Sequence, residues 1–166
     1  MMTNEELAGL VRPDSVHKRV YTDPAIFDLE MDRIYGRAWI YVGHESQVPK
    51  TGDFHTTRVG DQDVIMVRSQ DGAVKVLYNR CPHKGAKLVA EGDGCAGKFF
   101  RCPYHAWTFK LDGTHLSAPL RPGLEGTNYD PAKPEFSMLP LARVDSYRGF
   151  VFASQSKEGV DLRAFL

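Results

Sequence analysis

The sequence predicts a mainly β fold, an antiparallel β-sandwich or small barrel with a two-loop subdomain and an N-terminal amphipathic helix. Three observations carry this prediction: short apolar runs separated by turns, one helical pattern near the N-terminus, and two similar loops that each hold a cysteine and a histidine. Alternation with a period of two marks strands, whereas apolar residues three and four apart mark a helix. We expect an N-terminal segment and helix at 1–40, the β domain at 41–155, and the start of a further domain at 156–166.

Length and composition suit one globular domain. The 166 residues are 42% hydrophobic and 25% charged, which allows one sizeable core. The 21 basic and 21 acidic side chains cancel, which argues against a nucleic-acid partner. No apolar run is long enough to span a membrane, and the acidic start MMTNEELAGLV lacks a signal-peptide pattern, so we expect a cytoplasmic protein. The odd count of three cysteines fits reduced thiols.

The first element is a helix within residues 22–38. Thr22 or Asp23 is a candidate N-cap, and Pro24 suits the first turn. The apolar residues that fall roughly on one face are Ile26, Phe27, Met31, Ile34, Tyr35 and Ala38. This face predicts a helix that docks on a sheet.

Short strands follow beyond Gly43. The runs FHTTRV, DVIMVRS and AVKVLYN are rich in β-forming residues, and GDQ and QDG separate them as hairpin turns. The later runs KFFRC, AWTFKL, PLARVDSY and GFVFAS continue the pattern. Several strands at close, turn-separated spacing are typical of an antiparallel sandwich or a small barrel.

Two later segments differ from this pattern. Residues 111–138 are rich in glycine, proline and polar residues, which predicts a long excursion over the surface. The ending SQSKEGVDLRAFL resembles the first turns of an amphipathic element. We therefore expect these 166 residues to be the front part of a longer protein.

The two Cys/His loops carry the chemistry. Cys81-x-His83 is followed, after 18 residues, by Cys102-x-x-His105, and each cysteine precedes a proline. Thiolate and neutral imidazole are metal ligands. One hypothesis is a structural zinc ion bound by all four side chains, and the other is a [2Fe–2S] cluster with two cysteines on one iron and two histidines on the other. The short Cys-x-His spacing and the loop setting favour the cluster.

At these residues the sequence resembles a known family. CPHKG and CPYHAW, followed by F-x-LDG, look like the Rieske domain of aromatic-ring-hydroxylating oxygenase α subunits, and RAWIYVGHESQVPKTGDF is similar to the segment before that domain. The resemblance extends from about residue 21 to the end. It implies that Cys81 and Cys102 bind the inner iron and that His83 and His105 bind the outer, more exposed iron. Cys95 matches no ligand position, and we expect a free thiol on a turn.

The resemblance implies an electron-transfer role. The chain would relay electrons from a ferredoxin or an NAD(P)H-dependent reductase to a mononuclear iron, which oxidises an aromatic hydrocarbon with O₂ in a catalytic domain outside these residues. No catalytic residue is expected here, and the remaining histidines are widely spaced: His17, His44, His55 and His115. The family also implies a trimer of α subunits, with or without a β subunit. A free-standing Rieske ferredoxin, which the N-terminal helix disfavours, and a zinc-stabilised module are the alternatives.

Residues around the motif bear on the reduction potential of the cluster that the resemblance implies. Lys84 and Tyr104 replace the bridging cysteines of high-potential Rieske proteins, and Trp107 and Phe109 replace their serine and tyrosine hydroxyls. Fewer hydrogen bonds to sulfur predict a potential near about −150 mV, the low end of the Rieske range. Ala106 stands where the family usually has glycine, and its methyl group crowds the loop if the backbone needs a positive φ.

Basic residues surround the ligands in the sequence. They are Arg80, Lys84, Lys87, Lys98 and Arg101. Either they are ordinary solvated charges, or they form a basic rim that steers an acidic ferredoxin or reductase toward the histidines.

Overall fold

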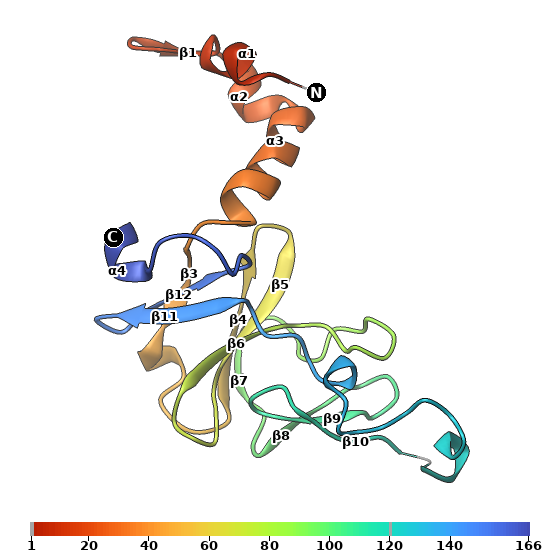
Figure 1. The fold of residues 1–166 in the computed structure, drawn as a ribbon. Coiled ribbons are helices and arrows are strands. Elements are labelled where there is room, and N and C mark those ends of the chain that lie inside the picture. The colour runs from red at the N-terminus through yellow and green to blue at the C-terminus, as the bar shows by residue number, and fades with distance from the viewer. Residues whose placement is uncertain (1, 120) are drawn as a thin grey trace.

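In the computed structural model, which describes residues 2–119 and 121–166, the β-rich runs form antiparallel sheets on one side of an N-terminal arm (Figure 1). The central sheet has the strand order β6-β5-β4-β7. Its strands are β4 (Asp53–Val59), β5 (Gln62–Arg68), β6 (Val74–Tyr78) and β7 (Asp93–Cys95). Gly60 and Gly72 have φ angles of 63° and 81° in the turns that separate β4, β5 and β6. The predicted GDQ and QDG turns are therefore confirmed.

A second antiparallel sheet covers one face of the central sheet, with the order β11-β12-β3. Its strands are β3 (Ile40–His44), β11 (Arg143–Tyr147) and β12 (Phe150–Ser154), and the short helix η2 (Glu45–Gln47) follows β3. The buried side chains of this core, core A, are Val42, Val48, Val59, Val64, Met66, Val76, Leu141, Val151 and Ala153. β11 and β12 match predicted strands. β3 was not predicted, because its apolar residues continue the pattern of the preceding helix.

The third sheet carries the two Cys/His loops and has the order β10-β9-β8. Its strands are β8 (Phe99–Arg101), β9 (Thr108–Lys110) and β10 (His115–Ser117). The buried residues of this core, core B, are Ile65, Val67, Leu77, Cys81, Leu88, Phe100, Cys102, Trp107, Phe109, Leu111, Ala118 and Met138. Successive side chains of β5 enter core A and core B in turn, because they point to opposite faces of the strand. The predicted antiparallel β fold is confirmed, and the sheets of the described residues form no closed barrel.

The N-terminal arm projects away from the sheets (Figure 1). Its elements are α1 (Asn4–Ala8), β1 (Val11–Arg12), β2 (Ser15–Val16), α2 (Arg19–Thr22), α3 (Pro24–Glu30) and the π-helix η1 (Met31–Tyr35). Asp23 caps α3 as predicted, since its carboxylate accepts from the Ala25 amide at 3.0 Å. The expected docking on a sheet holds only at the end of the helical segment, where Met31 and Tyr35 lie beside Gly60 of the β4–β5 turn. Farther up the arm Ile26 is buried, but Phe27 and Ile34 are about half exposed. The π-turn widens the last part of the helix and ends the 3.6-residue period.

The C-terminal segment returns to the root of the arm. The Trp39 indole donates to the Val160 carbonyl at 3.0 Å, and the Gln155 amide donates to the Tyr35 carbonyl at 3.1 Å. The helix α4 (Leu162–Phe165) then begins at its cap, Asp161, as the ending of the sequence predicted. Every helix in the described parts of the chain is too short or too polar to cross a bilayer.

The excursion between β9 and β11 contributes to core B. Besides β10 it contains the short helices η3 (Arg121–Leu124) and η4 (Pro134–Phe136). His115, Ala118 and Met138 are each at most 5% exposed. The segment runs largely over the surface as predicted, and a few of its apolar and aromatic residues fold inward over core B.

Candidate metal centre

Loop 1 (residues 81–86) closes through its own backbone. The Cys81 amide donates to the Ala86 carbonyl at 2.8 Å, and the Gly85 amide donates to the Cys81 carbonyl at 2.9 Å. Gly85 has a φ of 74°, which glycine adopts without strain. The turn leaves the Cys81 side chain in core B.

Loop 2 (residues 102–107) repeats this frame, although its cysteine–histidine spacing is one residue longer. The Cys102 amide donates to the Trp107 carbonyl at 2.8 Å, and the Ala106 amide donates to the Cys102 carbonyl at 3.0 Å. Ala106 occupies the position of Gly85 and has a φ of 57°. Because this φ is positive, the Ala106 methyl group strains the loop, as the sequence predicted for that case.

The loops bring the two cysteines together inside the protein. Cys81 and Cys102 are 2% and 3% exposed and form no disulfide. Burial, with a further contribution from the neighbouring Cys102 thiol, raises the pKa of the Cys81 thiol to about 11. The buried Cys81 thiol therefore stays protonated unless a cation holds it as a thiolate.

The two histidines also face each other. The ring centroids of His83 and His105 are 4.7 Å apart with an interplanar angle of 70°. His83 is half-buried and His105 is exposed. The Nδ1 atom of His83 is buried and has no hydrogen-bond partner among the described residues. Burial, then the charges of His105 and Lys84, lower the pKa of His83, which favours the neutral imidazole that binds metals.

The four donors fit a binuclear cluster better than a single ion. In the described ranges, no three His, Cys, Asp or Glu side chains converge on one point that could hold one ion. A structural zinc ion needs four donors around one point. A Rieske cluster takes two protein ligands at each of its two irons, and a buried cysteine pair beside a more exposed histidine pair meets that demand.

Asn79 anchors loop 1, although sequence reasoning missed it. It is 4% exposed, and its Oδ1 atom accepts from the amides of Leu88 at 2.9 Å and Val89 at 3.2 Å. Its Nδ2 atom donates to the Val89 carbonyl at 2.9 Å. The available signal was a polar residue at the end of a predicted strand, directly before the RCPH motif.

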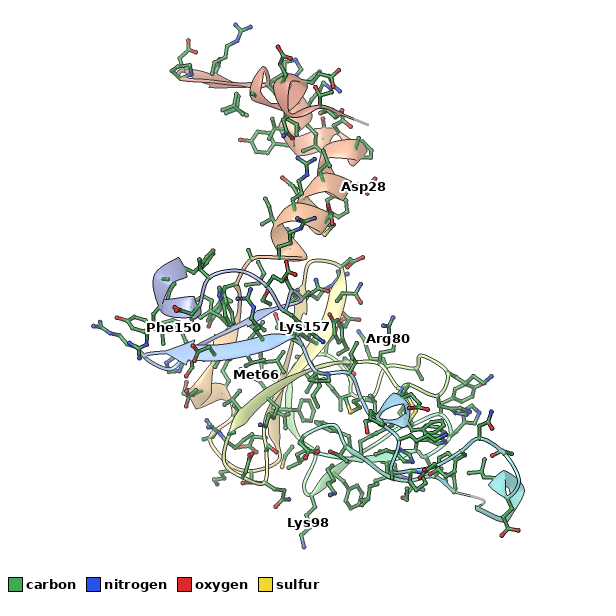
Figure 2. All side chains as sticks on the ribbon, viewed as in Figure 1. Asp28, Met66, Arg80, Lys98, Phe150 and Lys157 are labelled. Carbon is green, nitrogen blue, oxygen red and sulfur yellow. The ribbon has the colours of Figure 1, made fainter. Side chains whose placement is uncertain are left out.

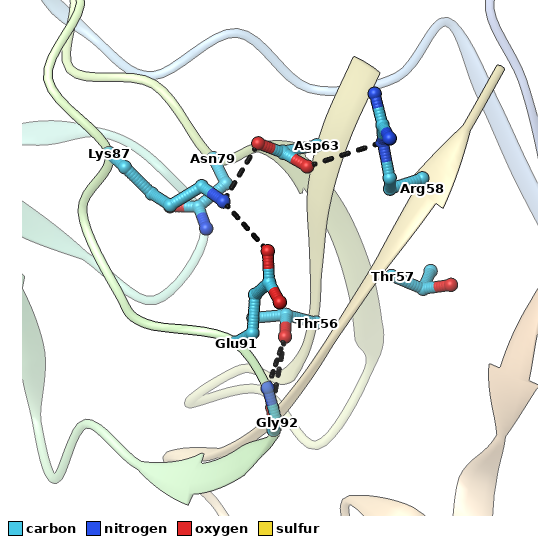
Figure 3. A pocket seen from close by; sticks show the side chains of 8 residues that line it. All are labelled: Thr56, Thr57, Arg58, Asp63, Asn79, Lys87, Glu91 and Gly92. Carbon is cyan, nitrogen blue, oxygen red and sulfur yellow. Dashed lines mark hydrogen bonds and ion pairs between the residues drawn. The ribbon is translucent and has the colours of Figure 1, made fainter. Parts of the chain in front are cut away.

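Lys87 lies in a polar groove next to this anchor, and Figure 3 shows its ammonium between two carboxylates. The Nζ atom is 2.9 Å from Asp63 Oδ2 and 3.4 Å from Glu91 Oε1. The Asp63 carboxylate, and to a lesser extent Glu91, raise the pKa of Lys87. The ion pair with Asp63 connects the residue after loop 1 to β5, and the two carboxylates offset the Lys87 charge.

The basic residues around the motif differ in their surroundings. Lys87 is neutralised, and Figure 2 shows Arg80 and Lys98 at separate places on the molecule. Lys84 is exposed and adjoins His83.

The other candidate residues lie outside the two loops. Cys95 is an exposed free thiol as expected, but it ends strand β7 rather than lying on a turn. His55 hydrogen-bonds Asp93 at 2.5 Å, and the imidazole of His44 contacts the Ser46 hydroxyl at 2.9 Å. Within the structure's described residues, no histidine pair joins a carboxylate as a metal site.

Comparison with known proteins places the two Cys/His loops within a known domain family. The Rieske [2Fe-2S] domain matches residues 38–129. Biphenyl 2,3-dioxygenase subunit alpha from Rhodococcus jostii (strain RHA1) is 36% identical over 97% of this chain and 34% of its own length. N,N-dimethyl phenylurea N-demethylase subunit alpha from Sphingobium sp. (strain YBL2) is 41% identical over 89% of this chain and 31% of its own length.

Solved structures agree with these relatives. Naphthalene 1,2-dioxygenase from Rhodococcus sp. superposes with a TM-score of 0.86 and 29% identity, over 99% of this chain and 38% of that chain. The quaternary ammonium Rieske monooxygenase CntA superposes with a TM-score of 0.79 and 35% identity, over 89% of this chain and 39% of that chain. The chain thus spans about a third of the length of the curated relatives it matches. It belongs to the Rieske [2Fe-2S] domain family, and it is similar to part of the α subunits of aromatic dioxygenases.

Proposed function

We propose that Cys81 and Cys102 hold one iron of a [2Fe–2S] cluster and that His83 and His105 hold the other. One observation carries the assignment: the partnerless, buried Nδ1 atom of His83 lies in a pair of facing loops that also bury two free thiols. A buried ring nitrogen without a partner is costly unless it binds something. A single zinc ion is disfavoured, because no three of these donors converge in the described structure.

When bound, the cluster supplies reversible uptake of one electron. The chain controls where a partner protein can approach it. Both cysteines are almost fully buried, whereas His105 is exposed. Electron donors and acceptors therefore meet the histidine side, where Tyr104 and Lys84 are also exposed. The absence of hydroxyls at Trp107 and Phe109 supports a potential near about −150 mV.

The role we propose is electron delivery within an aromatic-ring-hydroxylating oxygenase. A ferredoxin or an NAD(P)H-dependent reductase supplies the electrons, and a mononuclear iron in the remainder of the α subunit receives them. The biphenyl and benzene dioxygenase α subunits among the relatives support an aromatic substrate. The N-demethylase and the quaternary ammonium monooxygenase contain similar domains, but their names refer to other substrates.

A free-standing Rieske ferredoxin is the second candidate, and the N-terminal arm disfavours it. The arm exposes large apolar side chains, with Tyr21 at 78%, Val11 at 55% and Phe27 at 53%. A small soluble carrier gains nothing from such a surface, whereas a subunit of an assembly can bury it. The superposition on naphthalene 1,2-dioxygenase covers 99% of the chain and so includes the arm.

The proposal is tested with the purified chain, NADH, and the ferredoxin and reductase of a biphenyl dioxygenase system. We expect NADH to bleach the cluster's visible absorbance through these carriers, with no hydroxylated product from biphenyl. Formation of hydroxylated product by these 166 residues would contradict the proposal that the catalytic iron lies outside them. A cluster that dithionite reduces but these carriers do not would argue against electron entry from a ferredoxin of this class.

A further inference from the structure

The two histidines of the candidate cluster site have different surroundings. The indole of Trp107, from loop 2, stacks on the imidazole of His83, from loop 1, with a centroid distance of 4.7 Å and an interplanar angle of 8°. Trp107 is 8% exposed. The ring nearest to His105 is Tyr104, at 3.7 Å and 33°, and Tyr104 is 67% exposed. His83 therefore packs against a buried ring, whereas His105 packs against a ring that is exposed to solvent.

Three other rings, all from the excursion, also surround Trp107. The ring centroids of His115, Tyr129 and Phe136 lie 4.8, 5.8 and 5.9 Å from the Trp107 ring. His115 Nε2 and the Tyr129 hydroxyl share a hydrogen bond of 2.7 Å, and the His115 amide donates to the Ser137 hydroxyl at 3.0 Å. These bonds fix the later part of the excursion against β10. We call Trp107, His115, Tyr129 and Phe136 the aromatic box.

We propose that Trp107, held in place by the aromatic box, is a positioning residue that fixes the plane of the His83 imidazole and keeps water from that side of the cluster. The inference rests on the proposed function, since it assigns His83 as a ligand. A flat stack on a ligand ring restricts the rotation that would turn Nδ1 away from the iron. The excursion, which holds no ligand itself, thereby acts on the redox centre through one indole.

The effect on the potential has a defined sign. Reduction adds one negative charge, and an apolar surrounding disfavours the more charged form. Replacing Trp107 by leucine admits water beside His83 and lets its ring rotate. The reduced form becomes better solvated, so the potential shifts to more positive values. Looser ligand orientation broadens the electron paramagnetic resonance (EPR) signal of the reduced cluster and speeds its loss to a chelator by about tenfold.

The test compares Trp107→Leu and Trp107→Phe with Trp39→Leu in the full 166-residue chain carrying its cluster. Trp39 is a matched control: it is 7% exposed, but it lies at the root of the arm, with the Arg143 guanidinium 4.5 Å from its ring. Potential, EPR line shape, chelator-induced cluster loss and unfolding temperature are measured for each. We expect Trp107→Leu to change the first three, Trp107→Phe to restore them in part, and Trp39→Leu to lower the unfolding temperature alone.

Tyr129→Phe keeps the test decisive if Trp107→Leu does not fold with a cluster. It removes only the hydroxyl that hydrogen-bonds His115, and Tyr78→Phe is its control, because the Tyr78 hydroxyl donates to Gln155 at 3.0 Å outside the box. A broadened signal in Tyr129→Phe and not in Tyr78→Phe supports the proposal. Wild-type potential and line shape in both Tyr129→Phe and Trp107→Phe would overturn it. A wild-type chain without a Rieske signal would instead refute the proposed function.

Discussion

At the scale of single residues, loop 2 carries a strain that loop 1 avoids. The two loops share their hydrogen bonds and a left-handed residue four positions after the cysteine, which is Gly85 in one and Ala106 in the other. An L-residue in this conformation costs about 1–2 kcal/mol relative to ordinary dihedrals. Ala106 is tolerated because the surrounding sheet holds the loop.

Exchanging the two residue types should change stability in opposite directions. We expect Ala106→Gly to raise the free energy of unfolding by up to about 1 kcal/mol, since strain relief exceeds the added freedom of the unfolded chain. Gly85→Ala should lower it by about 1 kcal/mol, because a Cβ there meets no atom closer than 3.9 Å and only the backbone resists. Urea unfolding of the cluster-loaded chain measures both. Destabilisation by Ala106→Gly would show that the left-handed backbone is not strained.

The ligand assignment predicts a change of potential. His83→Cys or His105→Cys replaces a neutral imidazole by an anionic thiolate, so the potential should fall from about −150 mV toward the about −400 mV of all-cysteine clusters. Redox titration followed by visible absorbance measures the shift. An intact cluster with an unchanged potential would mean that the substituted histidine is not a ligand.

The four ligand candidates could be proposed from the sequence because each pair lies within four residues. Asn79 and the stack of Trp107 on His83 could not, since both depend on where loop 1 lies relative to other parts of the chain. Tyr129 was hidden for the same reason: its partner His115 is 14 residues earlier in a segment with no periodic pattern.

At the scale of elements, β5 connects the scaffold to the site. The side chains of its continuous apolar run enter core A and core B in alternation. The run therefore predicted a strand, but it did not reveal which core each face of the strand would join. The helix at 22–38 shows the opposite outcome. Its cap was predicted, but the π-turn at Met31–Tyr35 changed the phase of its apolar face, which no local signal in the sequence revealed.

The connection between β6 and loop 1 depends on Asn79 more than on Lys87. Asn79→Ala leaves two amides and a carbonyl without partners in a buried place, so we expect it to cost about 1–3 kcal/mol and to speed cluster loss. Lys87→Met is the comparison, and loss of its solvent-exposed ion pairs should cost less than loss of the Asn79 hydrogen bonds. Thermal unfolding and chelator challenge measure both. Equal costs would contradict the buried anchor.

At the scale of the whole molecule, the arm and the sheets differ in how they are held. Both sheet cores are buried, whereas within residues 2–38 of the described chain Ile26 is the one buried residue. Local stability follows burial. We expect trypsin to cut the isolated chain in the arm first and to leave a cluster-loaded fragment that begins near residue 38, detected by mass spectrometry. Early cleavage within the sheets would contradict this order of stability.

The central claim is that the two loops hold a Rieske cluster, and low-temperature EPR of the purified, dithionite-reduced chain tests it most directly. We predict a rhombic signal with a low average g value, as expected for a [2Fe–2S] centre with two histidine ligands, together with two irons per chain. A silent spectrum with one zinc ion per chain would contradict the claim and would make the loops a structural metal clasp.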